Sequence, residues 1–465
     1  MRKLGECAIV VGASIGGLMA ARVLADFYST VIIVDRDRFP DSPQSRRGVP
    51  QGLHSHLLMR RGSLEMSGLF PGLLDELVDS GATVWGDGDL TAVDVSLGGH
   101  RLVRNGRFAD RDSTTLYGTS RPLLEFHVRR RVLALKNVVA REAHEFIDLV
   151  FDGDRVTGIR VRKQDTSQED QLSADLVVDA TGRGSRMPVL LESRGYHRPA
   201  EDELTIRLTY SSQLFRMSTH EPHEVVVNVG FQPGRPKAMG LFSYENDLWM
   251  LTVVGIAGHQ PPSEVSGMLD EVDELAPPHV GAALRSAEPV GEPARFHTPS
   301  NRWRRYDKLR RFPKGLVVTG DAFCSFNPIY GQGMTVATLD ALALRDALAS
   351  GDSQLARRYF TKAAKVTQAA WNMAVGSDLA LPEVGGKLTR AMRLSNLYTD
   401  RVLSCAESNP AVAEKFWKVI NLTAQPSQLF HPAVLVPVAT SLARPRIGRR
   451  KVRAITKRKA GSSTG

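Results

Sequence analysis

A glycine-rich loop near the N-terminus has the spacing of a dinucleotide-binding turn. It lies between an apolar run at 8–11, which is typical of a strand, and a segment at 18–28 with helical spacing. In that position backbone N–H groups and the positive end of a helix can meet a pyrophosphate. A second apolar run, at 31–34, ends in a carboxylate about 20 residues on, where it can bind a ribose hydroxyl. We therefore predict nucleotide contacts from Gly12, Ala13, Ser14, Ile15, Gly16, Gly17, Asp35 and Arg36.

Ser14 stands where the dinucleotide fingerprint has its middle glycine. Its side chain slightly restricts close approach of the backbone, but serine is small and can itself hydrogen-bond a phosphate. A glycine-rich loop alone would indicate only a tight turn. The flanking apolar runs and the carboxylate of Asp35 are what favour nucleotide binding.

A second glycine turn, far downstream, indicates which nucleotide is bound. The apolar run 316–318 is typical of a buried strand and ends in Gly320 and Asp321, and a later turn opens a helix near Gly333. The carboxylate of Asp321 can accept from a ribityl hydroxyl, and the helix start can stabilise the negative edge of a reduced flavin. The predicted contacts here are Gly320, Asp321, Pro328, Gly331, Gln332, Gly333 and Met334.

Together the two motifs resemble those of the FAD-dependent monooxygenases of the para-hydroxybenzoate hydroxylase type, and the resemblance covers most of the chain. Residues 179–186, Asp-Ala-Thr-Gly-Arg-Gly-Ser-Arg, resemble the family's middle motif, which is associated with both FAD and NAD(P)H. Arg121, which follows Ser120 at the start of a predicted helix, matches the family's arginine near the FAD phosphates. The resemblance adds Arg121, Asp179, Gly182 and Arg186 to the expected cofactor contacts.

Two further segments are most similar to the polyene epoxidases of polyether ionophore biosynthesis, of the lasalocid and monensin type. They are 46–51, Arg-Arg-Gly-Val-Pro-Gln, followed by His54 and His56, and 326–331, Phe-Asn-Pro-Ile-Tyr-Gly. This resemblance implies FAD contacts from Arg47, Gly48 and Val49 and epoxidation of one or more alkenes in an apolar, polyketide-like intermediate. The two histidines are candidates for the substrate cavity. Anchoring of the loop is an equal alternative, and no cysteine or carboxylate cluster accompanies them, so we expect no metal.

The resemblance implies that NADPH or NADH reduces the FAD, that dioxygen forms a flavin C4a-hydroperoxide, and that one oxygen atom passes to the apolar substrate. An isolated alkene needs no side-chain base, whereas a phenol hydroxylase needs a group that draws off the phenolic proton. No residue within 204–257 stands out for that task. Apolar residues in this segment usually pack in a core. Those that could instead line an apolar cavity are Phe215, Phe231, Met239, Phe242 and Trp249.

Several other functions share these motifs. An aromatic hydroxylase or an alkene reductase of the geranylgeranyl reductase type would carry the same FAD motifs. Flavin halogenases are also similar, but the segment around Trp249 lacks their paired tryptophan motif. A binding protein with a structural FAD is the alternative outside enzymes.

The pattern of apolar runs predicts an α/β fold. Runs without polar alternation indicate a parallel sheet covered on both faces, and helical spacing recurs at 64–78 and 121–135. Longer strands between 204 and 257 indicate a mainly antiparallel second unit. We predict a doubly wound FAD/NAD(P)-binding domain of the glutathione-reductase-like Rossmann type at 1–190 and 291–350, an inserted β-rich substrate domain at 191–290, a helical region at 351–443 and a basic, disordered tail at 444–465.

The formal net charge of +10 comes from the C-terminus. Nine of the 60 Lys and Arg residues lie after position 443 with no acid among them, which leaves 51 bases and 50 acids elsewhere. Such a run is usually a solvated tail and less often an arm for anionic surfaces, and no nucleic-acid-binding module accompanies it. The apolar stretch 433–443 is too short to cross a bilayer and can at most touch its surface.

Three widely spaced cysteines predict no disulfide framework, and the N-terminus does not resemble a signal peptide. Both features favour the cytoplasm.

Overall fold

The computed structural model, which describes residues 3–217 and 222–442, contains a five-stranded parallel sheet. The strand order is β17-β11-β1-β2-β7, and every neighbouring pair is parallel. Residues 8–11 of the central strand β1 are buried because helices and a small antiparallel sheet cover the two faces of the parallel sheet. This is why the run lacks polar alternation. The strands are β1 (Gly5–Val11), β2 (Tyr28–Val34), β7 (Val138–Arg141), β11 (Leu176–Asp179) and β17 (Leu316–Val318).

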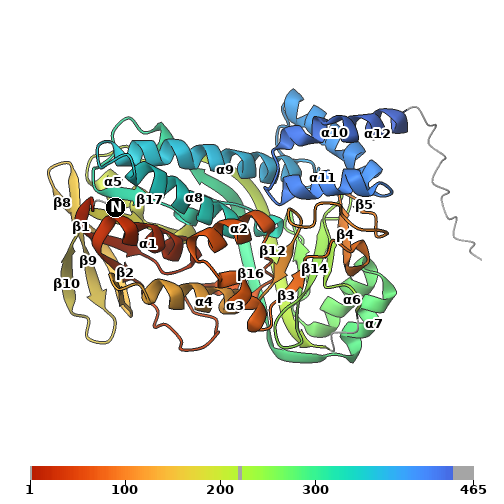
Figure 1. The fold of residues 1–465 in the computed structure, drawn as a ribbon, viewed down its shortest axis with the longest axis horizontal. Coiled ribbons are helices and arrows are strands. Elements are labelled where there is room, and N and C mark those ends of the chain that lie inside the picture. Colours follow the sequence, from red (N-terminus) through yellow and green to blue (C-terminus); the bar gives the residue numbers. More distant parts are fainter. Residues whose placement is uncertain (1–2, 218–221, 443–465) are drawn as a thin grey trace, which may run out of the picture.

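Helices and a small antiparallel sheet cover this parallel sheet (Figure 1). Helix α1 (Ile15–Phe27) packs beside α8 (Gly333–Leu348) and α4 (Arg121–Leu133), and their apolar faces share one core with the strands. The antiparallel sheet, with order β10-β9-β8, adds its own buried residues to that core. Its strands are β8 (His144–Asp152), β9 (Arg155–Lys163) and β10 (Glu169–Ser173), and the short helix α5 (Met187–Ser193) follows β11.

The segment 64–78, which has helical spacing throughout, forms parts of two helices rather than one. Helix α2 (Arg60–Leu69) and helix α3 (Leu73–Asp79) are separated by Phe70, Pro71 and Gly72. Gly72 has a φ of 80°, in the left-handed region that favours glycine, and proline cannot continue a helix through its missing N–H. The periodicity of apolar residues continues across the break, so spacing alone does not reveal it.

A mainly antiparallel sheet of eight strands packs beside the parallel sheet and its covering helices (Figure 1). Its order is β18-β16-β12-β15-β14-β13-β4-β5, in which only the β13–β4 pair is parallel. Helices α6 (Val265–Leu275) and α7 (Pro278–Ser286) cover part of one face. The strands are β4 (Val93–Leu97), β5 (His100–Arg101), β12 (Glu201–Arg216), β13 (Val226–Val229), β14 (Lys237–Ser243), β15 (Leu248–Gly255), β16 (Glu288–Arg304) and β18 (Cys324–Ser325), with the separate pair β3 (Thr83–Trp85) and β6 (Leu116–Gly118) nearby.

The eight-stranded sheet takes strands from all three of the segments 1–190, 191–290 and 291–350. Strands β4 and β5 come from the first segment, and β18 comes from the third. The division of the chain at 190 and 290 therefore remains a prediction, because sheet partners need not be neighbours in sequence.

Helices dominate the chain after α8, as predicted. Helix α9 (Leu355–Leu379) packs along α8, and α10 (Arg390–Ala406), α11 (Pro410–Ile420) and α12 (Pro432–Leu442) form a group beside β5 (Figure 1). None of the helices within 3–217 and 222–442 is long and apolar enough to cross a membrane. The basic segment 444–465 lies outside the described residues.

Candidate functional site

The three sequence motifs meet at the carboxyl edge of the parallel sheet. The Gly12 N–H donates to the Val34 carbonyl at 2.8 Å, and the Ala180 N–H donates to the Val11 carbonyl at 2.8 Å. The Thr319 N–H donates to the Asp179 carbonyl at 2.9 Å. These bonds join the loops that follow β1, β11 and β17, where parallel α/β sheets bind their ligands.

Glycines allow these loops to approach closely. Gly12 has a φ of 101°, and a Cβ there would lie 2.5 Å from the Ala180 carbonyl oxygen. A Cβ on Gly16 would lie 3.9 Å from Gly320 Cα, which brings the first and last motifs side by side. Added side chains would fill this cradle, so the glycines leave room for a ligand against the backbone.

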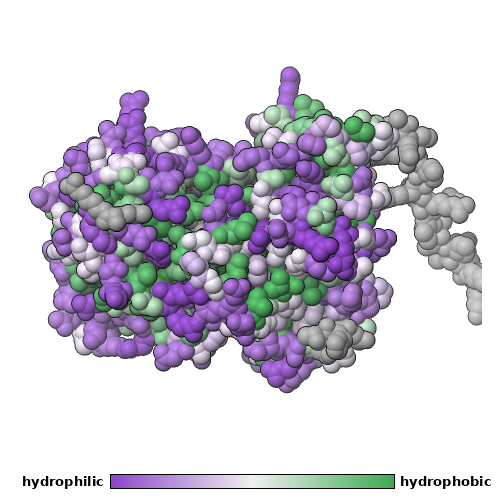
Figure 2. Space-filling model, in the orientation of Figure 1, coloured by the Kyte–Doolittle hydropathy of each residue, from purple (hydrophilic) through white to green (hydrophobic). Residues whose placement is uncertain are grey.

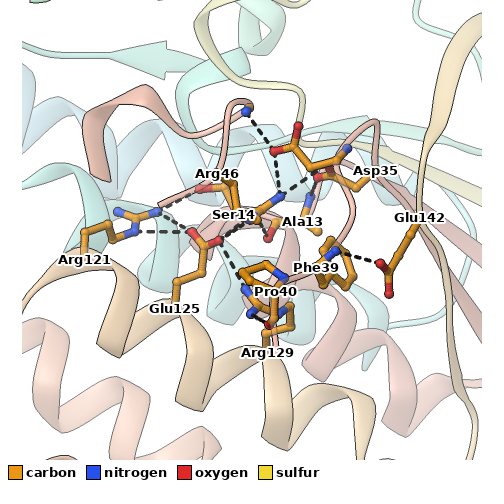
Figure 3. Close-up of polar contacts among 12 residues, drawn as sticks. Ala13, Ser14, Asp35, Phe39, Pro40, Arg46, Arg121, Glu125, Arg129 and Glu142 are labelled. Atoms are coloured by element: carbon orange, nitrogen blue, oxygen red, sulfur yellow. Dashed lines mark hydrogen bonds and ion pairs between the residues drawn. The ribbon is translucent and has the colours of Figure 1, made fainter. Parts of the chain in front are cut away.

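A buried charged cluster supports the first glycine loop (Figure 3). Arg121 Nη2 donates to Ser14 Oγ at 2.8 Å, which gives the serine in the middle glycine position a partner. Arg46 Nη2 donates to the Ala13 carbonyl at 2.9 Å and to Glu125 Oε1 at 2.6 Å. Arg121 also pairs with Glu125, at 3.4 Å, so one carboxylate holds both guanidinium groups.

Asp35, which directly follows β2, hydrogen-bonds the backbone of the loop. Its Oδ2 accepts from the Ala13 N–H at 2.6 Å, and its Oδ1 accepts from the Asp37 N–H at 2.8 Å. Burial raises the pKa of Asp35, and Arg46, 3.3 Å away, acts in the opposite direction. The structure thus places Asp35 at the predicted position and shows that its carboxylate already orders the loop backbone.

Arg46, which the sequence linked to the site only through the resemblance of segment 46–51, lies at the centre of this cluster. It contacts Asp35, Asp37 and Glu125, and its side chain is 3% exposed. By contrast, the predicted contacts Arg36 and Arg47 are exposed. Sequence spacing could not identify Arg46, because its main partner is 79 positions away.

Asp321 and Arg183 lie at the open side of the cradle. Asp321 is reached by solvent from that side, while protein on its other sides raises the pKa of its carboxyl group, and Arg183 and Arg121 oppose the increase. Arg183 donates to Ser325 Oγ at 3.0 Å and to the Ser300 carbonyl at 2.5 Å. An accessible carboxylate with arginines around it can accept from a ligand hydroxyl, and the contact of Asp321 with a cofactor stays a prediction.

The remaining residues of the middle motif divide between the interior and the surface. Asp179 is buried and accepts from the Thr181 N–H at 3.0 Å and from Ser185 Oγ at 2.5 Å, so it orders its own turn. Gly182 has a φ of 78°, and Arg186 is exposed.

A buried aspartate that belongs to no motif holds the second glycine turn. Asp378, at the end of α9, accepts from Asn327 Nδ2 at 2.8 Å and from Tyr330 Oη at 2.7 Å. It also accepts from Asn301 Nδ2 on β16 at 2.6 Å. After this turn Gly331 adopts a left-handed φ of 66°, and α8 begins at Gly333. Of the other predicted contacts here, Val49, Gln332 and Met334 are buried, Gly48 is half-buried, and Pro328 is exposed.

The ring of His54 joins its loop to the eight-stranded sheet, whereas the ring of His56 bonds within the loop, to the His54 carbonyl at 2.9 Å. His54 Nδ1 is hydrogen-bonded to Ser212 Oγ at 2.8 Å, and its ring lies edge-on to Tyr210 with centroids 4.5 Å apart. Burial lowers the pKa of His54 to about 4 and that of His56 to about 3, so both rings are neutral at neutral pH. No group of three or more His, Cys, Asp or Glu side chains within the described ranges is arranged to hold a metal ion.

The structure separates the five apolar candidates for the substrate cavity. Phe215, Met239 and Trp249 lie in a core under α6 and α7. Side chains alternate along a strand, so Phe215 and Trp249 point away from the face that carries Ser212 and Thr252. Phe231 packs with Tyr210 in another cluster, and Phe242 packs against the core of the C-terminal helices.

Comparison with known proteins identifies the family. The family model described as FAD binding domain matches residues 7–374. The chain belongs to this FAD-binding family. It is 41% identical over 425 residues to Protein Rv3254 of Mycobacterium tuberculosis (strain ATCC 25618 / H37Rv), which covers 89% of each chain.

Two solved structures share the fold of this FAD-binding protein at low sequence identity. The p-nitrophenol 4-monooxygenase PnpA from Pseudomonas putida DLL-E4 is 16% identical, with a TM-score of 0.63 over 90% of this chain and 99% of that one. The flavin-dependent brominase Bmp2 is 11% identical, with a TM-score of 0.64 over 95% and 99%. The predicted fold class and the prediction of FAD are confirmed.

The residues present fit FAD. The glycine cradle between the β1 and β17 loops leaves room for a diphosphate, and Arg121 beside Ser14 supplies positive charge there. The accessible carboxylate of Asp321 would accept hydrogen bonds from hydroxyl groups of the cofactor.

Proposed function

We propose that this FAD-binding protein is a monooxygenase that epoxidises one or more alkenes of an apolar, polyketide-like substrate, with NADPH or NADH as reductant. FAD, when bound, would supply the redox and oxygen-activating chemistry. The first glycine loop, Arg121 and Asp321 would hold the cofactor, and the face of β12 and β15 that carries Ser212 and Thr252 would hold the substrate.

The side chains on that face are neutral, and this favours an alkene over a phenol as the substrate. His54 lies on it with a pKa of about 4, far too low for the ring to retain a proton taken from a phenol. Burial raises the pKa of Tyr210 next to it, so the phenol of Tyr210 stays protonated. Epoxidation of an isolated alkene needs no side-chain base, and these neutral groups suit it.

Aromatic hydroxylation is the second candidate, because hydroxyl groups form a chain on the same face. Ser212 Oγ lies 2.8 Å from His54 Nδ1 and 2.6 Å from Thr252 Oγ1. Thr252 Oγ1 in turn lies 2.6 Å from Ser55 Oγ. Such a chain can carry a proton away from a phenol.

Labelled dioxygen distinguishes these reactions. The FAD-loaded enzyme is supplied with NADPH or NADH, isotopically labelled dioxygen and a panel of polyenes and phenols, and the products are analysed by mass spectrometry. Epoxidation adds one labelled oxygen to a polyene without loss of hydrogen. A hydroxylated phenol would replace our proposal by the second candidate, and a hydrogenated alkene without oxygen uptake would indicate a reductase.

His54→Gln sharpens the test. An epoxidase should keep its turnover nearly unchanged, because the ring transfers no proton. A phenol hydroxylase that uses the hydroxyl chain should lose about a hundredfold in kcat.

A further inference from the structure

A hydrophobic surface lies on the C-terminal helices, at the end of the molecule opposite β1 (Figure 1). Its large side chains are between 41% and 68% exposed. Phe430, in the 3₁₀ turn Pro426–Phe430, stacks on Tyr398 of α10 with ring centroids 4.8 Å apart. Tyr398 follows Leu394 by one turn of α10. Figure 2 shows hydrophobic atoms over these helices. The residues of this C-terminal apolar surface are Leu394, Leu397, Phe430, Leu435 and Val436.

Helix α12 exposes large apolar side chains as well as burying them. Val434 and Val438 are buried in the core of the C-terminal helices, whereas Leu435 and Val436 point outward. No Asp, Glu, Lys or Arg occurs within 419–443. A surface helix that only completes a core normally carries polar residues on its outer face. The exposed parts of Leu435 and Val436 therefore favour a surface that contacts another molecule.

Positive charge lies beside this surface on α10 and follows it in the sequence. Arg390 and Arg393 are exposed on the first turn of α10, beside Leu394. The nine bases of 444–459 follow α12 directly in the sequence, and they account for nearly all of the net charge. An apolar helix followed by a run of bases is the composition of segments that lie in the surface of an anionic bilayer.

We propose that the C-terminal apolar surface and the basic segment after it dock this protein on membranes that contain anionic phospholipids. Helix α12 is too short to span about 30 Å of hydrocarbon, so it would lie in the interface. A nucleic acid would use the bases and leave the apolar side chains without a role. A second copy of the chain would use the apolar side chains and leave the bases without one. An anionic bilayer uses both.

Vesicle flotation with the full-length, FAD-loaded protein tests the proposal. We expect binding to phosphatidylcholine vesicles that contain phosphatidylglycerol, weak binding to phosphatidylcholine alone, and release at high salt. Leu435→Gln/Val436→Gln and, separately, Arg449→Gln/Arg450→Gln/Lys451→Gln should each weaken binding at least about tenfold. Val139→Gln, at an exposed apolar position on β7, should bind like the wild type. FAD content and thermal unfolding confirm that each variant is folded.

Three results would overturn the proposal. Vesicle binding that is the same for wild type and Leu435→Gln/Val436→Gln would remove the role of the apolar surface. Tight binding to duplex DNA without binding to vesicles would assign the bases to nucleic acid. A dimer that Leu435→Gln/Val436→Gln dissociates, again without vesicle binding, would make this surface a contact between copies. None of these results depends on which substrate the enzyme oxidises.

Discussion

At the scale of single residues, the carboxylate of Glu125 pairs with both of the arginines that contact the first glycine loop. It is 4% exposed and pairs with Arg46 at 2.6 Å and with Arg121 at 3.4 Å. Those two guanidinium groups in turn hold the Ala13 carbonyl and Ser14 Oγ. The carboxylate therefore supports the cofactor loop through both arginines.

Glu125→Gln should lower the free energy of unfolding by about 3 kcal/mol, because it removes the paired carboxylate of buried Arg121 and one of the three carboxylates that contact Arg46. FAD should also bind more weakly, since Arg121 loses the partner that orients it. Urea denaturation and titration of the apoprotein with FAD measure the two effects. Glu65→Gln, in the surface pair with Arg61, is the matched control and should change stability by at most about 1 kcal/mol. Equal losses in the two variants would contradict the role of Glu125.

The buried carboxyl group of Asp340 on α8 should lower the free energy of unfolding as the pH rises. Burial raises its pKa from 3.8 to about 8, although the Gly320 N–H donates to the carboxyl group. Between these values the folded state keeps a proton that the unfolded state has lost, so stability falls as pH rises through this window. Asp340→Asn cannot ionise and should stabilise the protein over the wild type most at about pH 8 and least at about pH 4. Thermal unfolding across this range checks the trend, and a constant difference would refute it.

At the scale of elements, the turn between β1 and α1 has two glycines with different tasks. A Cβ at Gly12 meets backbone at 2.5 Å and the φ there is 101°, so Gly12→Ala should destabilise the fold by about 2 kcal/mol or more. A Cβ at Gly16 meets Ala337 Cβ only at 3.8 Å. Gly16→Ala should therefore fold normally and lose affinity for FAD. Urea unfolding and FAD titration of both variants separate the effects, and wild-type affinity in Gly16→Ala would show that FAD does not lie against that residue.

At the scale of the whole molecule, Asp378 joins three distant parts of the chain. It links α9 to Asn301 of the eight-stranded sheet and to Asn327 and Tyr330 of the turn before α8. The geometry of the second glycine turn therefore depends on the packing of both halves.

Asp378→Ala should leave three donors without an acceptor, and each buried unpaired group costs about 1–3 kcal/mol. We expect a large loss of stability together with faster release of FAD, measured by urea denaturation and by recovery of flavin fluorescence. Asp346→Ala, whose side chain is 55% exposed on α8, is the control and should change neither. Normal FAD retention in Asp378→Ala would show that the turn holds its shape without this contact.

Much of the fold could be predicted because its signals are local. Residues 8–11 and 176–178 are apolar without alternation, which already requires burial on both faces. The cavity candidates could not be assigned in the same way. Phe215 and Trp249 are buried like any core residue, and a strand pattern does not reveal which face a helix such as α6 covers. The helix break at Gly72 was hidden because its flanking residues keep helical spacing.

The sequence by itself determined the kinds of loops this protein contains, since glycines that tolerate positive φ and a carboxylate after a buried strand are local requirements of nucleotide binding. Only the tertiary structure decided how the loops are supported. Arg46 meets Glu125 across 79 positions, and Asp378 meets Asn301 across 77. Contacts at such separations depend on how the sheets and helices pack, and no spacing within one segment encodes them.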